Sequence, residues 1–393
     1  MIGIDPSLDD ARHVSTEAVP HVVIAVNQPI QHFSASFRAA SQSARLRLSV
    51  NYWEDTAGGQ FDPEFGRHVT WDADLLSGYH SVNAHGAGSA SRALSFLRSM
   101  RSLVPDLVVC FGWASAAARL TIPWCLLTRT PFLFYGDTSW QHDSTGFRAW
   151  LRHRMLRVAF RLASGALSSG AFNREFYIRL GMHPARIFDS VYPIDVDSYA
   201  AARHTHPHRG QIMIGFAGKL IARKGVDELL RALAVLSDDS SWNARIIGEG
   251  EERESLVELS LALGISSRVE FRGFRNASEM PAELAECDIV VVPSTRDNRG
   301  MIAAEAMAAG AAVIVSSNTG VWGRGDLIQE GRTGRVYRSG DHAELASVLG
   351  QLLGDAGLRE SLRREGALRA AEHGPDAFRT ALELATATIR RRD

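Results

Sequence analysis

Short apolar runs alternate with longer stretches of helical periodicity along most of the chain. In the first half, such runs predict strands at 22–26, 46–52, 107–110, 132–135 and 166–168. In the second half they predict strands at 212–216, 244–247, 269–271, 289–292 and 312–315. Intervening segments such as 226–236, 251–263 and 302–309 carry apolar residues at helical spacing. This alternation predicts an α/β protein whose parallel sheets are covered by helices on both faces.

The alternation is interrupted once, after Tyr199. Residues 201–210 are polar, include three histidines and a proline, and end in glycine. We interpret this segment as an interdomain linker. The histidines also suggest a metal-binding tract, but no acidic residue lies near them, so a solvated linker is favoured.

The length of the chain favours two domains. Its 393 residues exceed the roughly 250–300 at which a single core stops growing. We expect a first Rossmann-like domain at 1–205, a second at 206–375, and an amphipathic tail helix at 376–393. Doubly wound domains bind ligands at the carboxyl ends of their strands, so a cleft between two such ends is the expected site.

Composition excludes several classes of protein. The 43 Lys and Arg residues nearly balance the 44 Asp and Glu residues, so no overall field favours nucleic acid or membrane. Cys110, Cys125 and Cys287 form no CxxC pair, which indicates a reducing cytosol rather than disulfides or zinc. The N-terminus lacks a signal-peptide pattern, and the longest apolar run, 107–118, is shorter than the ~20 residues of a bilayer helix. We expect a soluble cytoplasmic protein with at most peripheral membrane contact.

The strongest motif lies at 291–310, where a buried strand ends in a polar loop and Gly300 opens a helix of small residues. The amides at the start of such a helix suit a diphosphate. Asp297 precedes the helix and Glu305 lies inside it, up to about 12 Å away. Carboxylates that far apart suit hydroxyl groups on different parts of one ligand. Alternatively, Asp297 caps the helix and Glu305 is a surface residue, but an unpaired carboxylate among Ala, Met and Ile is costly.

A second motif follows the strand at 212–216. Gly218 allows close approach of an anion to the backbone, and Lys219, Arg223 and Lys224 supply positive charge. Basic residues after a strand are more often a solvated turn, so this motif is weak alone.

Two further turns suit a nucleobase, one containing Gly248 and Gly250 and the other ending in Phe274. The first is not a dinucleotide fingerprint, because Arg253 stands where a third glycine is required.

Together, in this order and spacing, the four pieces resemble the C-terminal domain of glycosyltransferase family 4, over Gly215 to about Tyr337. The resemblance implies a GT-B fold: two Rossmann-like domains facing across a cleft, with the tail helix crossing back to the first. It implies that Lys219 and Lys224 bind the diphosphate, Glu305 the ribose and Asp297 the region of the donor sugar. The implied donor-binding set is Gly218, Lys219, Lys224, Gly248, Gly250, Phe274, Asp297, Asn298, Arg299, Gly300, Met301, Ile302 and Glu305.

The family usually has glutamate and an aromatic residue where this chain has Asp297 and Arg299. The shorter carboxylate reaches less far, so donor specificity is expected to be decided there.

The resemblance further implies a retaining hexosyltransferase that needs no metal and no cofactor beyond its nucleotide-sugar substrate. The absence of an Asp-x-Asp motif from the donor half agrees with metal independence. We expect a UDP- or GDP-sugar donor and a hydroxyl acceptor, in bacterial natural-product or glycoconjugate biosynthesis. The alternatives are a GT-B epimerase or phosphorylase and a non-catalytic sugar-nucleotide-binding subunit.

The first domain offers fewer candidates. His32 follows the first strand and Asp137 follows a later one, so both are expected near the cleft and are candidate catalytic residues. A lone histidine is more often a structural hydrogen-bonding residue. Residues 62–79 are rich in acids and aromatics, which suits a polyhydroxylated or amino acceptor, or equally a structural cap.

A helical stripe is formed by Phe147, Leu151, Met155, Val158 and Leu162. Arginines and Trp150 occupy a neighbouring face. The pattern favours a core helix with a solvated basic face, and the alternative is a helix that lies on a membrane surface.

Overall fold

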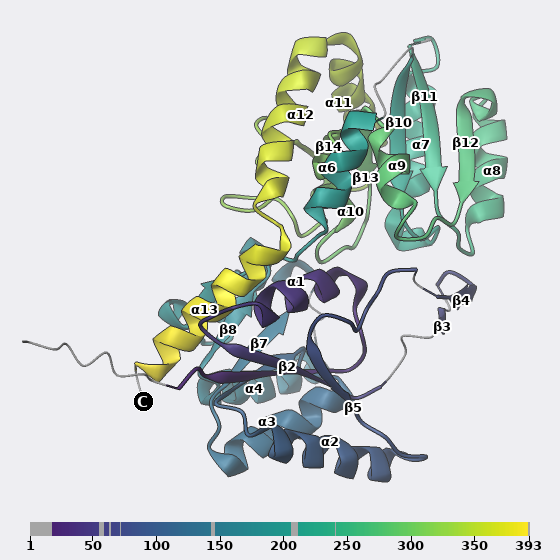
Figure 1. Cartoon of the computed structure of the whole chain (residues 1–393). Coiled ribbons are helices and arrows are strands. Elements are labelled where there is room, and N and C mark those ends of the chain that lie inside the picture. The colour runs from purple at the N-terminus through teal and green to yellow at the C-terminus, as the bar shows by residue number, and fades with distance from the viewer. Residues whose placement is uncertain are drawn as a thin grey trace, which may run out of the picture.

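The computed structural model describes residues 18–54, 59–62, 64–70, 72–142, 146–205, 211–239 and 241–391. It contains two parallel sheets, each with helices on both faces, stacked one above the other in Figure 1. The first sheet has the order β5-β2-β1-β6-β7-β8-β9. Its strands are β1 (His21–Val26), β2 (Arg47–Tyr52), β5 (His80–Asn83), β6 (Leu107–Phe111), β7 (Phe132–Gly136), β8 (Gly165–Ser168) and β9 (Ile187–Asp189).

Two helix layers cover the first sheet. One consists of α1 (Gln31–Ser41) and the C-terminal helix α13 (Pro375–Arg390). The other consists of α2 (Ser89–Leu103), α3 (Ala116–Thr128), α4 (Phe147–Leu162) and α5 (Ala171–Arg179). In Figure 1, α1 and α13 lie above this sheet and α2, α3 and α4 below it.

The second sheet has the order β12-β11-β10-β13-β14-β15. Its strands are β10 (Ile212–Ala217), β11 (Trp242–Ile247), β12 (Val269–Gly273), β13 (Ile289–Val292), β14 (Ala312–Ser316) and β15 (Arg335–Tyr337). One face carries α7 (Val226–Val235), α8 (Arg253–Ala262) and α11 (His342–Gly354). The other carries α6 (Val196–Thr205), α9 (Met280–Ala285) and α10 (Ile302–Ala308), with α12 (Ala356–Ala371) packed on α10.

The ten strands predicted from the sequence are all present, with boundaries within two residues. Five short strands were not predicted: β5, β9, β15 and the two strands of an antiparallel hairpin, β3 (Gln60–Asp62) and β4 (Arg67–Val69). Four of them have only three residues, too few for a periodic pattern to emerge, and the four-residue β5 contains a single apolar residue, Val82. Short 3-10 turns lie at Trp140–His142, Pro184–Arg186, Ala222–Lys224 and Ser266–Arg268.

The predicted linker is wrong in its first half. Residues 201–205 continue helix α6, which packs against α9 and α10 of the second domain. Burial of Tyr199 in that core stabilises a helix that the polar composition had argued against. The chain therefore crosses between the sheets before α6, ahead of the boundary expected at residue 205. Residues 206–210 lie outside the described residues.

The two crossings between the domains lie side by side. Ile194, just before α6, donates its backbone N–H to the carbonyl oxygen of His373, just before α13, at 3.0 Å. The tail helix then returns to the first domain as expected (Figure 1), where Phe378 is fully buried against Phe33 and Tyr135. No helix in the described part of the chain is long and apolar enough to span a bilayer.

The prediction that the apolar stripe of α4 faces the core is wrong. Its five residues are 47–74% exposed, and α4 instead buries Ala149, Leu156 and Phe160. These three residues are enough to hold α4 on the first domain, because Phe160 packs edge-on against Phe134 and Tyr177.

Replacing Phe378 should destabilise the protein through the first-domain core. Phe378→Ala leaves a cavity among Phe33, Phe37 and Tyr135 and should lower the free energy of unfolding by roughly 3–5 kcal/mol. Urea unfolding measures this loss. Leu384→Ala, on the exposed side of the same helix, should change it by no more than about 0.5 kcal/mol. Equal effects of the two variants would contradict the docking of α13.

Candidate functional site

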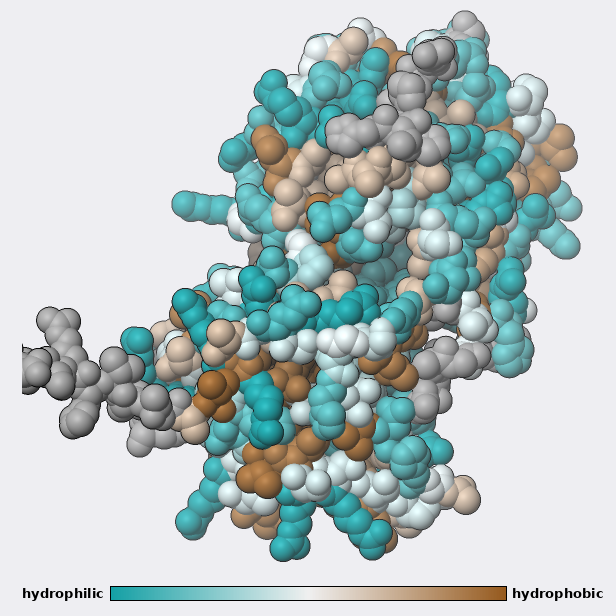
Figure 2. All heavy atoms as spheres, viewed as in Figure 1, coloured by the Kyte–Doolittle hydropathy of each residue, from teal (hydrophilic) through white to brown (hydrophobic). Residues whose placement is uncertain are grey.

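A cavity of about 660 Å³ lies between the two domains. The space-filling view shows the surface hollowed between the two lobes (Figure 2). Its first-domain wall comes from α1 and from the segment that contains the β3–β4 hairpin. Its second-domain wall comes from the loops after β10, β11 and β12, from α10 and from the start of α6. The carboxyl ends of the second sheet's strands thus open into the cavity.

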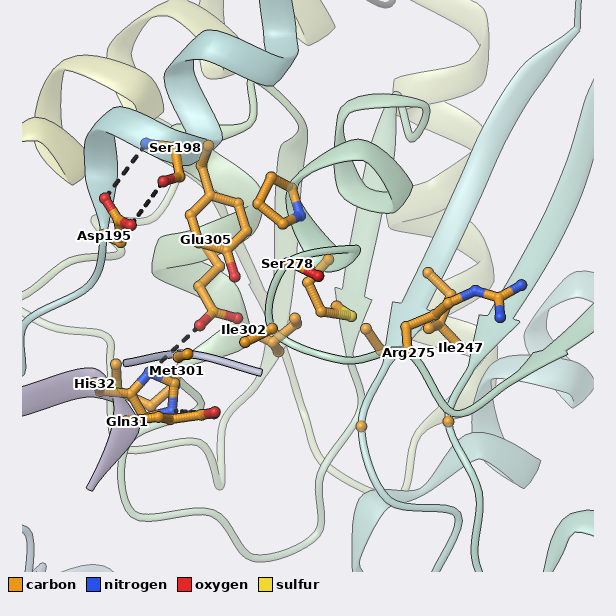
Figure 3. A pocket seen from close by; sticks show the side chains of 18 of the residues that line it. Gln31, His32, Asp195, Ser198, Ile247, Arg275, Ser278, Met301, Ile302 and Glu305 are labelled. Carbon is orange, nitrogen blue, oxygen red and sulfur yellow. Dashed lines mark hydrogen bonds and ion pairs between the residues drawn. The ribbon is translucent and has the colours of Figure 1, made fainter. Parts of the chain in front are cut away.

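His32 and Glu305 face each other across this cavity. Nδ1 of His32, on α1, lies 3.6 Å from Oε1 of Glu305, on α10, and the close view shows the carboxyl group pointing at the ring (Figure 3). Tyr199 forms a hydrogen bond with the same carboxyl group from α6. Glu305 is therefore neither a surface residue nor unpartnered.

Burial disfavours charge on both groups. It raises the pKa of Glu305 to about 7 and lowers the pKa of His32 to about 4. Between about pH 4 and pH 7 the contact is therefore between a protonated carboxyl group and a neutral imidazole rather than an ion pair. Near pH 7 the carboxyl group is poised between its two forms, which suits hydrogen bonding to hydroxyl groups.

The cations after β10 are paired with carboxylates of the other domain. Nζ of Lys219 lies 2.9 Å from Asp62 and 2.8 Å from Glu64. A guanidinium nitrogen of Arg223 lies 3.0 Å from Glu64. The hydrogen bond from Lys219 is the largest influence on Glu64 and holds the pKa of its carboxyl group below the ordinary value. Asp62 also has a lowered pKa, because Lys219 and two backbone N–H groups outweigh the effect of burial.

Both carboxylates come from the β3–β4 hairpin, which reaches from the first domain onto the second. Phe65 at its turn packs edge-on against Phe274 and lies under the ammonium group of Lys219. Beyond the hairpin, Asn276 donates to the carbonyl oxygen of Thr70 at 2.9 Å. The hairpin part of the acidic segment therefore docks over the basic loop, and Asp72 and Asp74 line the cavity, where contact with an acceptor stays a prediction. The end of the segment covers the first-domain core through Leu75 and Tyr79, as the alternative interpretation expected. Pro63 and Trp71 lie outside the described residues.

Asp297 has two roles in the fold. It accepts the backbone N–H of Gly300 at 2.8 Å and of Arg299 at 3.2 Å, so it caps the turn before α10. Its other oxygen lies 2.6 Å from Nζ of Lys224. Burial opposes ionisation of Asp297, but Lys224 and these N–H groups outweigh it and lower the pKa. Two amides expected to be free for a diphosphate are therefore already used by Asp297.

The glycines after β11 allow the backbone of this loop to pack closely against the loop after β10. A Cβ on Gly248 would lie 1.8 Å from the carbonyl oxygen of Gly218, and both residues have positive φ. Gly248 lines the cavity. Gly250 does not; it packs against the backbone of Leu220 instead.

Most of the predicted residues meet at the cavity. Those that line it are His32, Gly218, Lys219, Lys224, Gly248, Phe274, Asp297, Met301, Ile302 and Glu305. Arg299 does not line it, because it is buried in an ion pair with Asp326, 3.4 Å away, which also accepts the N–H of Ala171. Gly300 also lies behind the wall, where a Cβ would clash with Thr319.

Asp137 belongs to a second, neighbouring cavity of about 330 Å³. This cavity is lined by the ends of β1, β6 and β7 together with Tyr192. Asn298 of the other domain forms a hydrogen bond with Asp137. Burial is the largest influence on Asp137 and raises its pKa.

Sequence reasoning missed several cavity residues, chiefly Asp195, Ser198, Tyr199, Arg275 and Ser278. Figure 3 shows Asp195, just before α6, and Ser198, in the first turn of α6, above Glu305; the hydroxyl group of Ser198 donates a hydrogen bond to the carboxylate of Asp195. For Asp195 and Ser198, the available signal was the Asp-x-x-Ser pattern of a helix start.

Comparison with known proteins identifies relatives of the second domain. Residues 201–369 match the family model described as "Glycosyl transferases group 1". The chain is 35% identical over 172 residues to the D-inositol 3-phosphate glycosyltransferase of Nocardia farcinica. This alignment covers 42% of this chain and 37% of that protein. The chain spans less than half the length of the curated relatives that it matches. These matches confirm the resemblance predicted from the motifs, for the residues that they cover.

Solved structures extend the comparison to the whole chain. HepE from Anabaena, in complex with UDP, aligns over 94% of this chain and 100% of its own, with a TM-score of 0.69 at 18% identity. A glycosyltransferase from Rickettsia africae aligns over 95% and 100%, with a TM-score of 0.72 at 12% identity. The chain therefore has the predicted two-domain GT-B fold.

The opposite pKa shifts of His32 and Glu305 predict opposite pH dependences in two variants. In His32→Gln the raised pKa of Glu305 remains. The protonated Glu305 carboxyl group therefore contributes fully to the free energy of unfolding below pH 4.5, and this contribution is lost as the pH rises through about 7. In Glu305→Gln the lowered pKa of His32 remains, so its contribution grows as the pH rises from about 4 to 6.5. Each effect amounts to about 3 kcal/mol at most. Urea unfolding between about pH 5 and pH 7 measures both slopes; slopes of the same sign would contradict the assignment.

Proposed function

We propose that this protein is a retaining, metal-independent glycosyltransferase that moves a hexosyl group from a UDP- or GDP-sugar to a hydroxyl acceptor. The observation that carries the proposal is the cavity at the carboxyl ends of the second sheet, where two lysines and Glu305 line one wall. The family match at 201–369 spans all of these second-domain residues. The cavity volume also falls within the range of ordinary ligand sites, roughly 300–1,000 Å³.

In this proposal the donor lies along the second-domain wall. Its diphosphate binds Lys219 and Lys224, its ribose hydroxyls bond to Glu305, and its base lies near Gly248 and Phe274. The side chains of Lys219 and Lys224 are only 24% and 19% exposed, so their charges act in a poorly screened environment. They would stabilise the negative charge that develops on the leaving diphosphate, which is electrostatic catalysis rather than proton transfer.

We assign the acceptor to the first-domain side. The cavity around Asp137 offers amide groups of Asn27 and Gln28 beside the rings of Tyr135 and Tyr192, a lining that suits a polyhydroxylated acceptor. Burial raises the pKa of Asp137, which strengthens it as a proton acceptor for a hydroxyl group, and lowers the pKa of His32 to about 4, which weakens it in that role. His32 would instead hold the Glu305 carboxyl group in position.

A thermal-shift panel of UDP-, GDP-, ADP- and dTDP-sugars tests donor binding, since a ligand that binds only the folded state raises the melting temperature. Glu305→Gln should weaken binding of the stabilising nucleotide roughly tenfold, the scale of one lost charge-assisted hydrogen bond. Glu258→Gln, an exposed acid on α8, is the matched control and should bind as the wild type does.

Incubation with each donor alone separates the proposal from its alternatives. Slow release of free sugar and nucleoside diphosphate supports a transferase. Isomerisation of the sugar identifies an epimerase, and binding without any turnover in the presence of hydroxyl acceptors identifies a non-catalytic subunit. Unchanged nucleotide affinity in Glu305→Gln would remove the assigned role of that residue.

The β3–β4 hairpin should compete with the donor, because Asp62 and Glu64 already neutralise the cations after β10. Asp62→Asn with Glu64→Gln should tighten binding of the donor nucleotide by up to roughly tenfold, as expected if the docked hairpin occupies about nine molecules in ten. Isothermal titration calorimetry measures the change. The charge-matched control is Glu175→Gln with Asp189→Asn, whose side chains pair with arginines at the first-domain surface. Equal or weaker binding in the hairpin variant would contradict the competition.

A further inference from the structure

Helix α4 presents a continuous apolar stripe to solvent. Phe147, Leu151, Met155, Val158 and Leu162 are 74%, 47%, 66%, 56% and 53% exposed. Their spacing of three or four residues puts them on one side of the helix. The opposite side carries the buried Ala149, Leu156 and Phe160, so α4 has two apolar faces, of which the fold uses one.

Arginines border this stripe on both sides. At helical spacing, Arg154, Arg157 and Arg161 lie along one border with Trp150, and Arg148 lies along the other. The guanidinium group of Arg154 is 5.3 Å from the centre of the Trp150 ring. The helix contains no Asp or Glu.

The side chains of these four arginines are exposed. In the part of the chain that the structure describes, Arg148, Arg157 and Arg161 are exposed and form no ion pair. The basic character is local, because the whole chain has a net charge of −1.

The stripe differs from the scattered apolar residues of an ordinary surface. In the described part of the chain, six of the fifteen exposed large hydrophobic side chains belong to α4. Two more, Leu126 and Leu127, end α3 in the same helix layer. By contrast, α8, α12 and α13 each expose a single such residue: Leu261, Leu368 and Leu384.

We propose that α4 docks on the surface of an anionic lipid bilayer. A helix with an apolar stripe between rows of arginine can lie flat in the interface, with the stripe at the acyl chains and the guanidinium groups at lipid phosphates. Figure 1 shows α4 in the outer helix layer, on the side of the first sheet that faces away from the second domain.

Charge selects this partner over a second copy of the chain. A symmetric contact through α4 would bring the arginines of two helices together, and the helix supplies no carboxylate to neutralise them. An anionic bilayer instead offers negative charge along both borders of the stripe. This inference does not rest on the proposed function.

Co-sedimentation of the full chain with vesicles tests the docking. The protein should bind vesicles of phosphatidylcholine mixed with phosphatidylglycerol and remain in solution with phosphatidylcholine alone. Phe147→Ser with Met155→Ser and Val158→Ser should weaken binding at least a hundredfold, as an order-of-magnitude estimate from the apolar area withdrawn from lipid. The matched control, Leu261→Ser with Leu368→Ser and Leu384→Ser, removes three exposed apolar residues from other helices and should bind as the wild type does.

The charges are tested separately. Arg157→Gln with Arg161→Gln should weaken binding to the anionic vesicles roughly 25-fold, since each arginine near such a surface contributes about fivefold. Far-UV circular dichroism and thermal melting verify that each variant is folded. We expect all of them to fold, because the substituted side chains are exposed.

Three results would overturn the proposal: no binding of the wild type to anionic vesicles, equal binding of the α4 variant and its control, or equal binding with and without phosphatidylglycerol. Analytical ultracentrifugation without lipid tests the alternative partner, a second copy of the chain. A dimer that the α4 serine variant abolishes would assign the stripe to self-association instead.

Discussion

A buried parallel strand needs cover on both faces, and this requirement decides where a ligand can reach the protein. Each of the two sheets carries helices on either side, so the strand ends and their loops are the parts left open. The paired crossings at Ile194 and His373 hold the two open ends against each other. The cavity between the domains follows from this arrangement, and the residues that line it belong mainly to loops and helix starts.

The cavity is nearly balanced in charge without a ligand. Lys219 and Arg223 meet carboxylates of the first domain, Lys224 meets Asp297, and burial favours the neutral forms of His32 and Glu305. An anionic ligand must therefore exchange with carboxylates that already satisfy the cations. Release of a carboxylate from its cation costs little free energy when the carboxylate is then hydrated. Because the side chain of Glu64 is 42% exposed, it is already close to water. Under the proposed function, a donor that binds the basic loop would therefore displace the β3–β4 hairpin and loosen this contact between the domains.

The second-domain part of the site was predictable because its signals are local. Lys219 and Lys224 follow β10 directly, and a buried glutamate among Ala and Met in α10 requires a partner. The same local reasoning failed for Arg299, which is close in sequence to Asp297 but turns into the domain interface to pair with Asp326. Asp62 and Glu64 could not be connected to Lys219, because 157 and 155 residues separate them from it along the chain. For α4, periodicity identified the stripe but not whether it faced protein or solvent, because both apolar faces of the helix satisfy the same pattern.

The sequence by itself determined ten of the strands, the two-domain α/β architecture, and the basic and glycine-rich loops of the second domain. These depend on periodicity and on the backbone freedom of glycine, which act over a few residues. The tertiary structure alone decided that residues 201–205 extend α6, that acids from the first domain neutralise the second domain's cations, and that His32 faces Glu305. Such contacts depend on how distant surfaces meet, and the pairing of distant surfaces leaves no periodic trace in either segment.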